Sequence, residues 1–269
     1  MIDTSLWFLF PVAVCIATIA MMAGIGGAIL FAPFFMLVLR LGPLTALGAG
    51  LVIEVFGFSS GVIGYWRKKQ INFRLVKSLV VFTVPATLAG VVLGRFIPAF
   101  ILQILLVILL VYLAYQFLLT GKECLPKDPR CTGVSLADSV MPINWIVKIT
   151  SLAGGLKVGM ISAGLGEINE LNFIKRMKLP VAAASATSVF LVAVSASVGS
   201  VSHAYFLLSE GSTDIFTGVI SILVFCVPGV VAGAQIGVLL ANKLNARLMG
   251  KFVGGLFLVL AVFTFMLVI

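Results

Sequence analysis

Four polar side chains that could do chemistry stand within one short stretch of an otherwise apolar chain. The stretch reads GEINELN, residues 166–172, and it supplies Glu167, Asn169, Glu170 and Asn172. Glu167 and Glu170 lie one helical turn apart, which brings the two carboxyls close together. Two neighbouring carboxylates in an apolar setting rarely both ionise, so one of them tends to hold a proton. We therefore expect this cluster to handle protons, or to organise a cation that accompanies a substrate anion.

Three further ionisable residues lie inside apolar runs. Glu54 is a lone carboxylate in LGAGLVIEVFGFSSG, and a carboxylate within a membrane is costly and marks a functional site by default. The alternative for Glu54 is a protonated acid that hydrogen-bonds between helices. His203, the only histidine, either packs at the membrane interface or relays protons. Lys157 either neutralises Glu167 or meets an anionic substrate. We predict that Glu54, Glu167, Glu170 and His203 take part in proton coupling.

Composition places these residues in a membrane protein. Of the 269 residues, 61% are hydrophobic and 10% are charged, and the mean hydropathy is +1.23. A soluble domain of this size could not cover its surface with so little charge. We predict one all-α, polytopic domain over residues 1–269. The net charge of +9 comes from short loops between apolar runs, which indicates membrane topology and not nucleic-acid binding.

Apolar runs divide the chain into eight segments. They cover residues 5–39, 44–66, 76–95, 99–120, 143–174, 181–208, 215–241 and 248–269. Most have the roughly 20 residues that cross a bilayer. The runs 5–39 and 143–174 are longer and carry glycines at the middle. Each half of about 15 residues would be roughly 22 Å long, too short for a core of ~30 Å. These two runs are predicted to be broken, re-entrant hairpins.

The two halves of the chain repeat each other. VPATLAGVVLG (84–94) returns as VPGVVAGAQIG (227–237), and AGIG (23–26) returns as AGLG (163–166). Small residues at this spacing let helices pack closely, but packing alone does not explain why proline, alanine and glycine recur in order. Each repeat is predicted to hold one broken segment and three transmembrane helices. The predicted units are repeat one (5–120), a connecting loop (121–142) and repeat two (143–269).

Basic residues predict how the repeats sit in the membrane. If the run 143–174 enters and returns, the loops on one side carry fourteen basic residues and those on the other only Arg40 and Arg95. If all eight runs crossed, each side would carry eight, so the positive-inside rule favours re-entry. The repeats then have inverted topology, as in many transporters. By symmetry the run 5–39 also re-enters, which puts the basic loops in the cytoplasm and both termini outside the cell (plasma or inner) membrane.

The glycine breaks form the predicted substrate site. A broken helix exposes unpaired N–H groups at the start of its second half, and these groups attract anions together with the positive helix end. The first break is Gly24, Gly26 and Gly27, and the second is Gly164 and Gly166. Irregular backbone survives at that depth only where it lines a cavity. Glycine used for close packing alone is the alternative.

Neutral donors follow the second break. The stretch AAASATSVFLVAVSASVGS, residues 182–200, is rich in small and hydroxylated side chains. Close helix packing accounts for most of them, and Thr187 and Ser188 are the better candidates because they stand near a helix start beside the break. With Asn169 and Lys157 they complete the predicted substrate-binding set.

Motifs for other chemistry are absent from the sequence. It contains no nucleotide loop, zinc motif or catalytic triad, so we expect neither an enzyme nor a cofactor or metal. Cys124 and Cys131 share the loop GKECLPKDPRCTG, where they are either free thiols or a disulfide or metal clip.

These motifs resemble the sulfite exporter TauE/SafE family, within the class of toluene-sulfonate uptake permeases. AGIGGAILFAPFFMLV is similar to the family's first motif, roughly G-x-G-G-G followed by an apolar stretch and a proline. It falls on Gly24, Gly26, Gly27 and Pro33, with Ala28 in place of the third glycine. The resemblance covers essentially the whole chain. It implies a proton-coupled permease for small sulfur-containing anions such as sulfite or organosulfonates.

The second motif departs from the family pattern. It falls on Gly164 and Gly166, and then Glu167 and Ile168 stand where the family often has two more glycines. Because of this departure, the resemblance leaves the substrate and the coupling open, whereas the implied fold is unaffected. The alternatives are a cation/proton exchanger or cation permease that uses the membrane carboxylates, and an anion channel. The expected partners are a small anion, protons and the lipid bilayer, and the glycine-rich faces also allow a homodimer.

Overall fold

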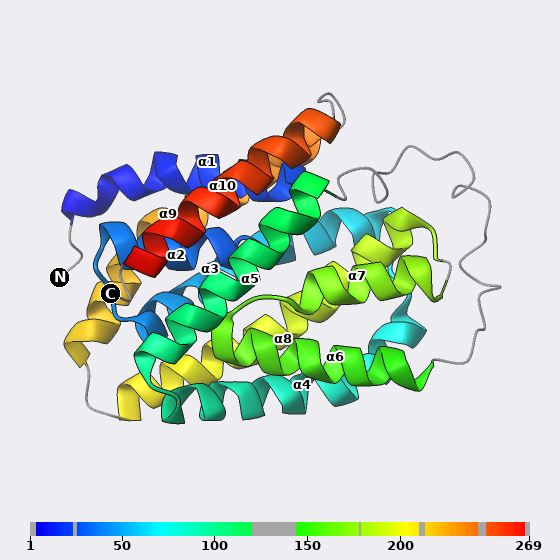
Figure 1. The fold of residues 1–269 in the computed structure, drawn as a ribbon, viewed down its shortest axis with the longest axis horizontal. Helices are drawn as coiled ribbons and strands as arrows, with labels where there is room; N and C mark the ends of the chain where they lie inside the picture. The colour runs from blue at the N-terminus through cyan, green and yellow to red at the C-terminus, as the bar shows by residue number, and fades with distance from the viewer. Residues whose placement is uncertain are drawn as a thin grey trace.

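Every element in the described part of the chain is helical. The computed structural model describes residues 4–23, 26–119, 144–177, 179–209, 213–241 and 246–266 (Figure 1). The elements are a 3₁₀ turn (Thr4–Phe8) and the helices α1 (Leu9–Ala23), α2 (Ala28–Val38), α3 (Pro43–Arg67), α4 (Phe73–Phe96), α5 (Ala99–Leu119), α6 (Trp145–Ile161), α7 (Leu165–Lys175), α8 (Val181–Ser209), α9 (Thr213–Ala241) and α10 (Ala246–Met266). The all-α prediction is confirmed. Gly24, Cys124, Cys131 and the predicted connecting loop lie outside the described residues.

Five of the described helices are long and apolar enough to cross a membrane. They are α3, α4, α5, α8 and α9. These helices follow the predicted runs closely, although α4 begins at Phe73 rather than at residue 76. The earlier start has a local cause, because the Asn72 side chain accepts a hydrogen bond from the Leu75 N–H and caps a first turn that carries charge. The chain is thus a polytopic membrane protein.

Both overlong runs are broken at their glycines. α6 ends at Ile161, Ser162 takes left-handed backbone with φ 57°, and α7 begins after Gly164 at φ 103°. A φ of 103° favours glycine because a Cβ would be strained there. In the first run, α2 begins directly after Gly27. α2 and α7 have 11 residues each, about 16 Å of helix, and cannot cross the bilayer alone.

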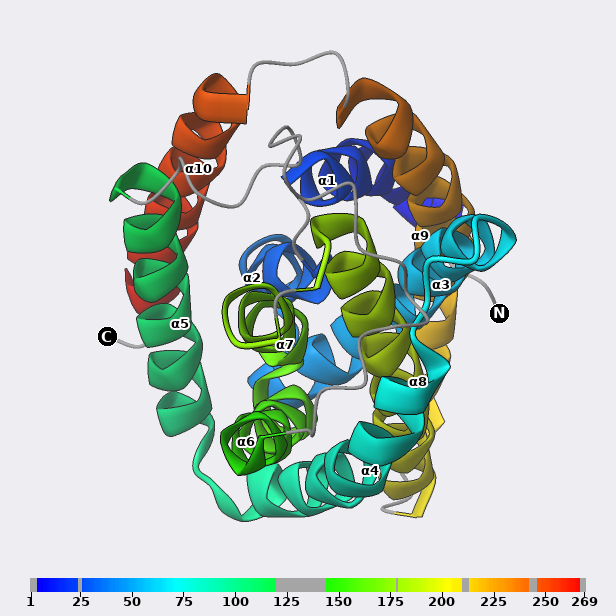
Figure 2. The same ribbon diagram turned by 90° about the vertical axis from the view of Figure 1, so that its right-hand side faces the viewer.

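The four half-helices divide between the two ends of the bundle. In Figure 1, α1 and α2 lie toward the end where the described chain starts and finishes, and α6 and α7 lie toward the opposite end. Figure 2 looks along the long axis and places α2 and α7 at the centre, between the α5–α10 pair and the α3–α8 pair. The two breaks therefore meet near the middle of the molecule.

The repeated glycine motif holds each half-helix against the other half of the chain. α1 packs mainly on α9, and α6 packs mainly on α4. A methyl group at Gly233 of α9 would overlap the Val14 carbonyl oxygen, and one at Gly90 of α4 would overlap that of Leu156. Glycine is therefore required for the close approach at both crossings. The pairs α3–α8 and α5–α10 also pack together, so exchanging the two halves leaves the pattern of helix pairs unchanged.

Candidate functional site

Glu167 connects the two breaks directly. Its Oε1 atom accepts a hydrogen bond from the backbone N–H of Gly26, with an N···O distance of 3.3 Å. Glu167 is also the third residue of α7, and its carboxylate lies close to the N–H groups of Gly164 and of Glu167 itself. A glutamate at this position commonly caps its own helix in this way. Here one carboxylate lies beside N–H groups from both breaks and is hydrogen-bonded to that of Gly26.

Glu54 occupies the matching place at the start of α2. It is buried in the middle of α3, with 4% of its surface exposed, and its carboxylate lies close to the N–H of Ala28, the first residue of α2. A Cβ atom at Gly26 would overlap Glu54 Oε1 and would lie 3.7 Å from Glu167 Oε1. The two carboxylates therefore meet at Gly26.

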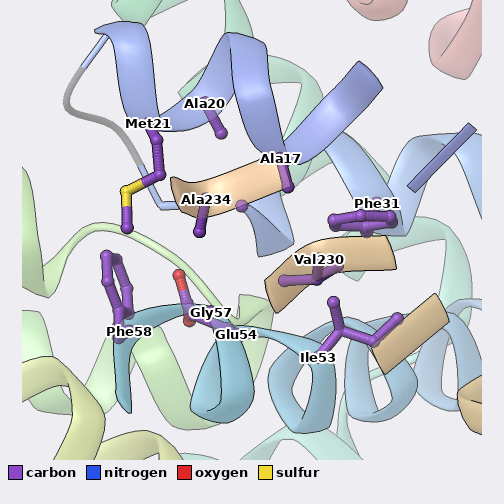
Figure 3. A pocket seen from close by; sticks show the side chains of 11 residues that line it. Ala17, Ala20, Met21, Phe31, Ile53, Glu54, Gly57, Phe58, Val230 and Ala234 are labelled. Atoms are coloured by element: carbon purple, nitrogen blue, oxygen red, sulfur yellow. The ribbon is translucent and has the colours of Figure 1, made fainter. Parts of the chain in front are cut away.

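The Glu54 carboxylate faces a pocket. Glu54 Oε2 has no hydrogen-bond partner among the described residues. Figure 3 shows the carboxylate pointing into a small pocket between α1, α2, α3 and α9, with Met21 and Ala234 opposite. The other walls of this pocket are apolar, and Gly27 contributes to them.

A second small pocket lies on the other side of the first break. Gly26, Glu54, Gly164, Gly166 and Glu167 line it, together with apolar side chains from α6 and α8. Residues predicted separately from the two glycine motifs and from the membrane carboxylates thus line one space.

The helix ends that should attract an anion already lie beside the protein's own carboxylates. The N-termini of α2 and α7 carry partial positive charge and unpaired N–H groups. Glu167 accepts the hydrogen bond of the Gly26 N–H, and the N–H groups of Ala28 and Gly164 lie close to the carboxylates of Glu54 and Glu167, respectively. Two like charges this close in a low dielectric repel each other, so a proton or a cation between them lowers the energy. The arrangement suits a site that exchanges protons or small ions.

The remaining polar residues of α7 divide between two neighbouring helices. Glu170 faces α8, where the Ser185 hydroxyl donates a hydrogen bond to it. Asn169 and Asn172 face α6: Ser151 donates to Asn169 Oδ1 at 2.7 Å, and Asn172 Nδ2 donates to Thr150 at 2.9 Å. The amides thus fasten the α6–α7 hairpin, and Asn169 does not line either pocket. The sequence analysis missed Thr150 and Ser151, although their hydroxyls stand on α6 where the amides needed partners.

Two of the neutral and basic candidates lie close to the second break. The Ser188 hydroxyl donates to the Gly166 carbonyl at 2.7 Å. The Lys157 methylene groups pass beside Gly164, but this side chain is exposed and makes no ion pair with a described residue.

Two other candidates lie farther from the breaks. Thr187 accepts a hydrogen bond from the Asn72 N–H at 3.1 Å, where α4 begins. The His203 ring nitrogen Nε2 lies 3.3 Å from the Gly159 carbonyl oxygen, in the last turn of α6. His203 therefore contacts a helix end rather than either glutamate.

Gly26→Ala is expected to remove transport with little loss of stability. The new methyl group would push aside the Glu54 carboxylate, which is the mobile end of a long side chain and can move at small cost. Transport and the melting temperature of the purified protein would be measured together. Gly64→Ala in α3 is the matched control, because a Cβ there meets nothing within 4 Å. Normal transport in Gly26→Ala would contradict the close contact between Gly26 and the Glu54 carboxylate.

The fold and this site define a class of protein: a polytopic membrane protein with an ionisable site enclosed between broken helices. The family model described as Sulfite exporter TauE/SafE matches residues 9–264, and the chain belongs to this family. It is a family of membrane transporters and not of enzymes.

A curated relative agrees with the family. The chain is 37% identical over 79 residues to a Bacillus subtilis (strain 168) protein described as probable membrane transporter protein YjnA. This match covers 29% of the chain and 31% of the relative. No solved structure matches the chain.

Proposed function

We propose that this transporter carries a small sulfur-containing anion, of the sulfite or organosulfonate class, together with protons. The observation that supports it most is the meeting of the two half-helix N-termini at Gly26, beside Glu54 and Glu167. Helix N-termini bind oxyanions through backbone N–H groups. Carboxylates at the same place give the site a means of sensing protons.

The proposed coupling is a competition for the same N–H groups. A charged Glu54 or Glu167 holds these groups and repels an anion. A proton on the carboxyl removes the charge and weakens the hydrogen bonds it accepts, since charged acceptors bind about twice as strongly as neutral ones. The substrate oxyanion then takes the released N–H groups. Anion and proton thus occupy the site together and move in the same direction.

The proposed movement is alternating access between two inverted repeats. The pairing of the helices supports this movement, because α1 of the first half packs on α9 of the second, and α6 of the second half packs in the same way on α4 of the first. So does the placement of the two hairpins toward opposite ends (Figure 1). In this proposal the basic end, which carries the turn between α3 and α4, faces the cytoplasm, and both termini lie outside the cell membrane.

The paired carboxylates also favour a second candidate, a cation/proton exchanger. Glu54 Oε2, which is buried and unpartnered among the described residues, could bind a cation directly. The described residues contain no cluster of three or more His, Cys, Asp or Glu side chains that could hold a metal ion. A monovalent cation is thus the form of this alternative that the carboxylate pair would suit.

Transport in proteoliposomes distinguishes the two candidates. Purified protein is reconstituted with a pH-sensitive dye inside, and gradients of sulfite, an alkylsulfonate, sodium or potassium are applied. Inward sulfite or sulfonate is expected to acidify the lumen, while protein-free liposomes give the background. Proton movement driven by a cation gradient alone would overturn the anion assignment. Anion movement without a pH change would overturn the proton coupling.

A further inference from the structure

The two half-helices that meet at the site differ in polarity. α2 reads AILFAPFFMLV and is apolar throughout, whereas α7 reads LGEINELNFIK. Counted from the first residue of each helix, the fifth and eighth residues are Asn169 and Asn172 in α7 but Ala32 and Phe35 in α2. Since each half-helix runs from the breaks toward its own end of the bundle, one end has a polar central helix and the other an apolar one.

A face of α7 continues the acidic site toward its own end of the bundle. Glu170 lies one turn beyond Glu167, and the Ser185 hydroxyl of α8 donates to its carboxylate. Tyr65, near the end of α3, is close enough to Glu170 to be affected by its charge. Among the described residues, the titratable groups whose charges act between themselves and Glu170 are Glu167 on α7 and Tyr65 on α3.

These side chains cover the distance from the site to the membrane boundary. Glu54 and Tyr65 are both on α3, eleven residues apart, which is about 16 Å along a helix. That distance is roughly half of the ~30 Å hydrocarbon core. Beyond Tyr65 lies the basic turn between α3 and α4, where Arg67, Lys68 and Lys69 are exposed.

Two buried polar atoms in this region have no partner. Glu54 Oε2 and Asn169 Nδ2 make no hydrogen bond with a described residue, and their side chains are 4% and 0% exposed. Buried polar atoms are nearly always hydrogen-bonded, and water supplies the bond where protein does not. At Glu54 Oε2 the missing bond is met by water or by a proton on the carboxyl, and at Asn169 Nδ2, on the α6 side of α7, by water.

Among the residues that the structure describes, the opposite half of the bundle offers no comparable series of acids. Phe31, Phe35 and Met36 of α2 are 0–3% exposed and fill the centre there. Pro43 to Ile53 of α3, which lead from that end to Glu54, include one polar side chain, Thr45.

The hydroxyls of α8 in that half mostly bond to their own helix. Ser197, Ser200 and Ser202 each donate to the carbonyl four residues earlier, which leaves them little capacity to pass a proton on. His203, also on α8 in that half, contacts the Gly159 carbonyl and is affected by the charge of Arg95.

We propose that protons reach the Glu54–Glu167 pair along α7, from the basic end, with Glu170 as the relay and Ser185 positioning its carboxyl. When a proton moves from the basic end to the site, water at that end protonates Glu170, and Glu170 passes a proton to Glu167. Release of a proton to the basic end runs the same steps in reverse. α2 closes the other end in this conformation. The inference rests on the proposed function, and it adds the route and the side from which protons arrive.

Cysteine labelling tests the route without any substrate. In a background with Cys15, Cys124, Cys131 and Cys226 replaced by serine, Ser185→Cys reports on the α7 route and Ala32→Cys on α2. A charged, membrane-impermeant thiol reagent is added to right-side-out and to inside-out vesicles. Ser185→Cys is expected to react only from the side that bears the turn between α3 and α4. Ala32→Cys is expected to react from neither side.

The opposite labelling result would overturn the route. An unreactive Ser185→Cys, in a variant that melts like its background, would mean that no water reaches Glu170. Equal labelling of Ala32→Cys from the other side would mean that α2 does not close that end.

Transport by two further variants separates this route from the proposed function. Glu170→Gln and Ser185→Ala are expected to lose most proton movement while sulfite or sulfonate still raises their melting temperatures as in the wild type. Ser185→Thr, which keeps the hydroxyl, is expected to restore proton movement. Wild-type proton flux in Glu170→Gln would overturn the relay but leave the anion–proton carrier intact. A wild type that carries no sulfite or sulfonate would overturn the carrier, while the labelling result would still stand.

Discussion

Glu54→Gln and Glu167→Gln are each expected to lose proton-driven accumulation of the anion entirely, while anion-for-anion exchange continues. Glutamine has the size of glutamate and resembles its neutral form, but it cannot take up or release a proton. By the proposed competition, a neutral side chain leaves the N–H groups of Gly26 and Ala28 available to the substrate. Anion binding should therefore persist and become independent of pH.

Two transport assays on the same proteoliposomes measure this outcome. One follows accumulation of labelled anion driven by a pH gradient, and the other follows counterflow with no gradient. Glu54→Asp and Glu167→Asp keep the titratable group but shorten it by one methylene, and they should retain part of the pH-driven signal. Full accumulation by either glutamine variant would show that this residue does not carry the coupled proton.

Gly159→Ala is expected to destabilise the protein more than Gly26→Ala or Gly64→Ala. Its Cβ would overlap the Thr87 carbonyl oxygen and lie 2.7 Å from the Val91 nitrogen and 2.9 Å from the Gly90 carbonyl carbon. All three atoms are backbone, so relief requires α4 and α6 to move apart. Overpacking of this kind typically costs about 1–3 kcal/mol.

Gly94→Ala is the matched control for this effect. The same methyl group on the same pair of helices would lie 3.6 Å from Met160 Cα, an ordinary contact. Alanine is also favoured over glycine in a helix by about 0.8–1.0 kcal/mol. In detergent, Gly159→Ala should therefore melt several degrees below the wild type, and Gly94→Ala at or above it. Equal melting temperatures for the two variants would mean that the helices are not in close contact.

Helix breaks and crossings could be predicted from the sequence because glycine and proline act locally. Gly164 was identifiable because an overlong apolar run needs an interruption, and the interruption needs a residue that tolerates positive φ. The recurring motif around Gly90 and Gly233 marked the two closest helix contacts for a similar reason, since only glycine fits there.

The rotation of each helix could not be predicted, and it decides which candidates meet. Neighbouring helix residues point about 100° apart, so Ser188 bonds to α7 while Thr187 bonds to the start of α4. Nearly uniform apolar helices give little indication of which face is buried. Gly155 and Gly159 face α4, and Lys157, midway between them, points elsewhere and is exposed. The contact of Glu167 with Gly26 joins residues 141 positions apart and has no local signal.

The pairing of α1 with α9 affects how the chain can be made. α1 leaves the ribosome before α9, its main packing partner, which follows roughly 190 residues later, about 10–40 s at ordinary rates of synthesis. Until then the first hairpin has to wait in the translocon or in lipid without the helix that holds it. Co-expressed fragments divided within residues 121–142 should therefore accumulate together, whereas either fragment alone should be degraded.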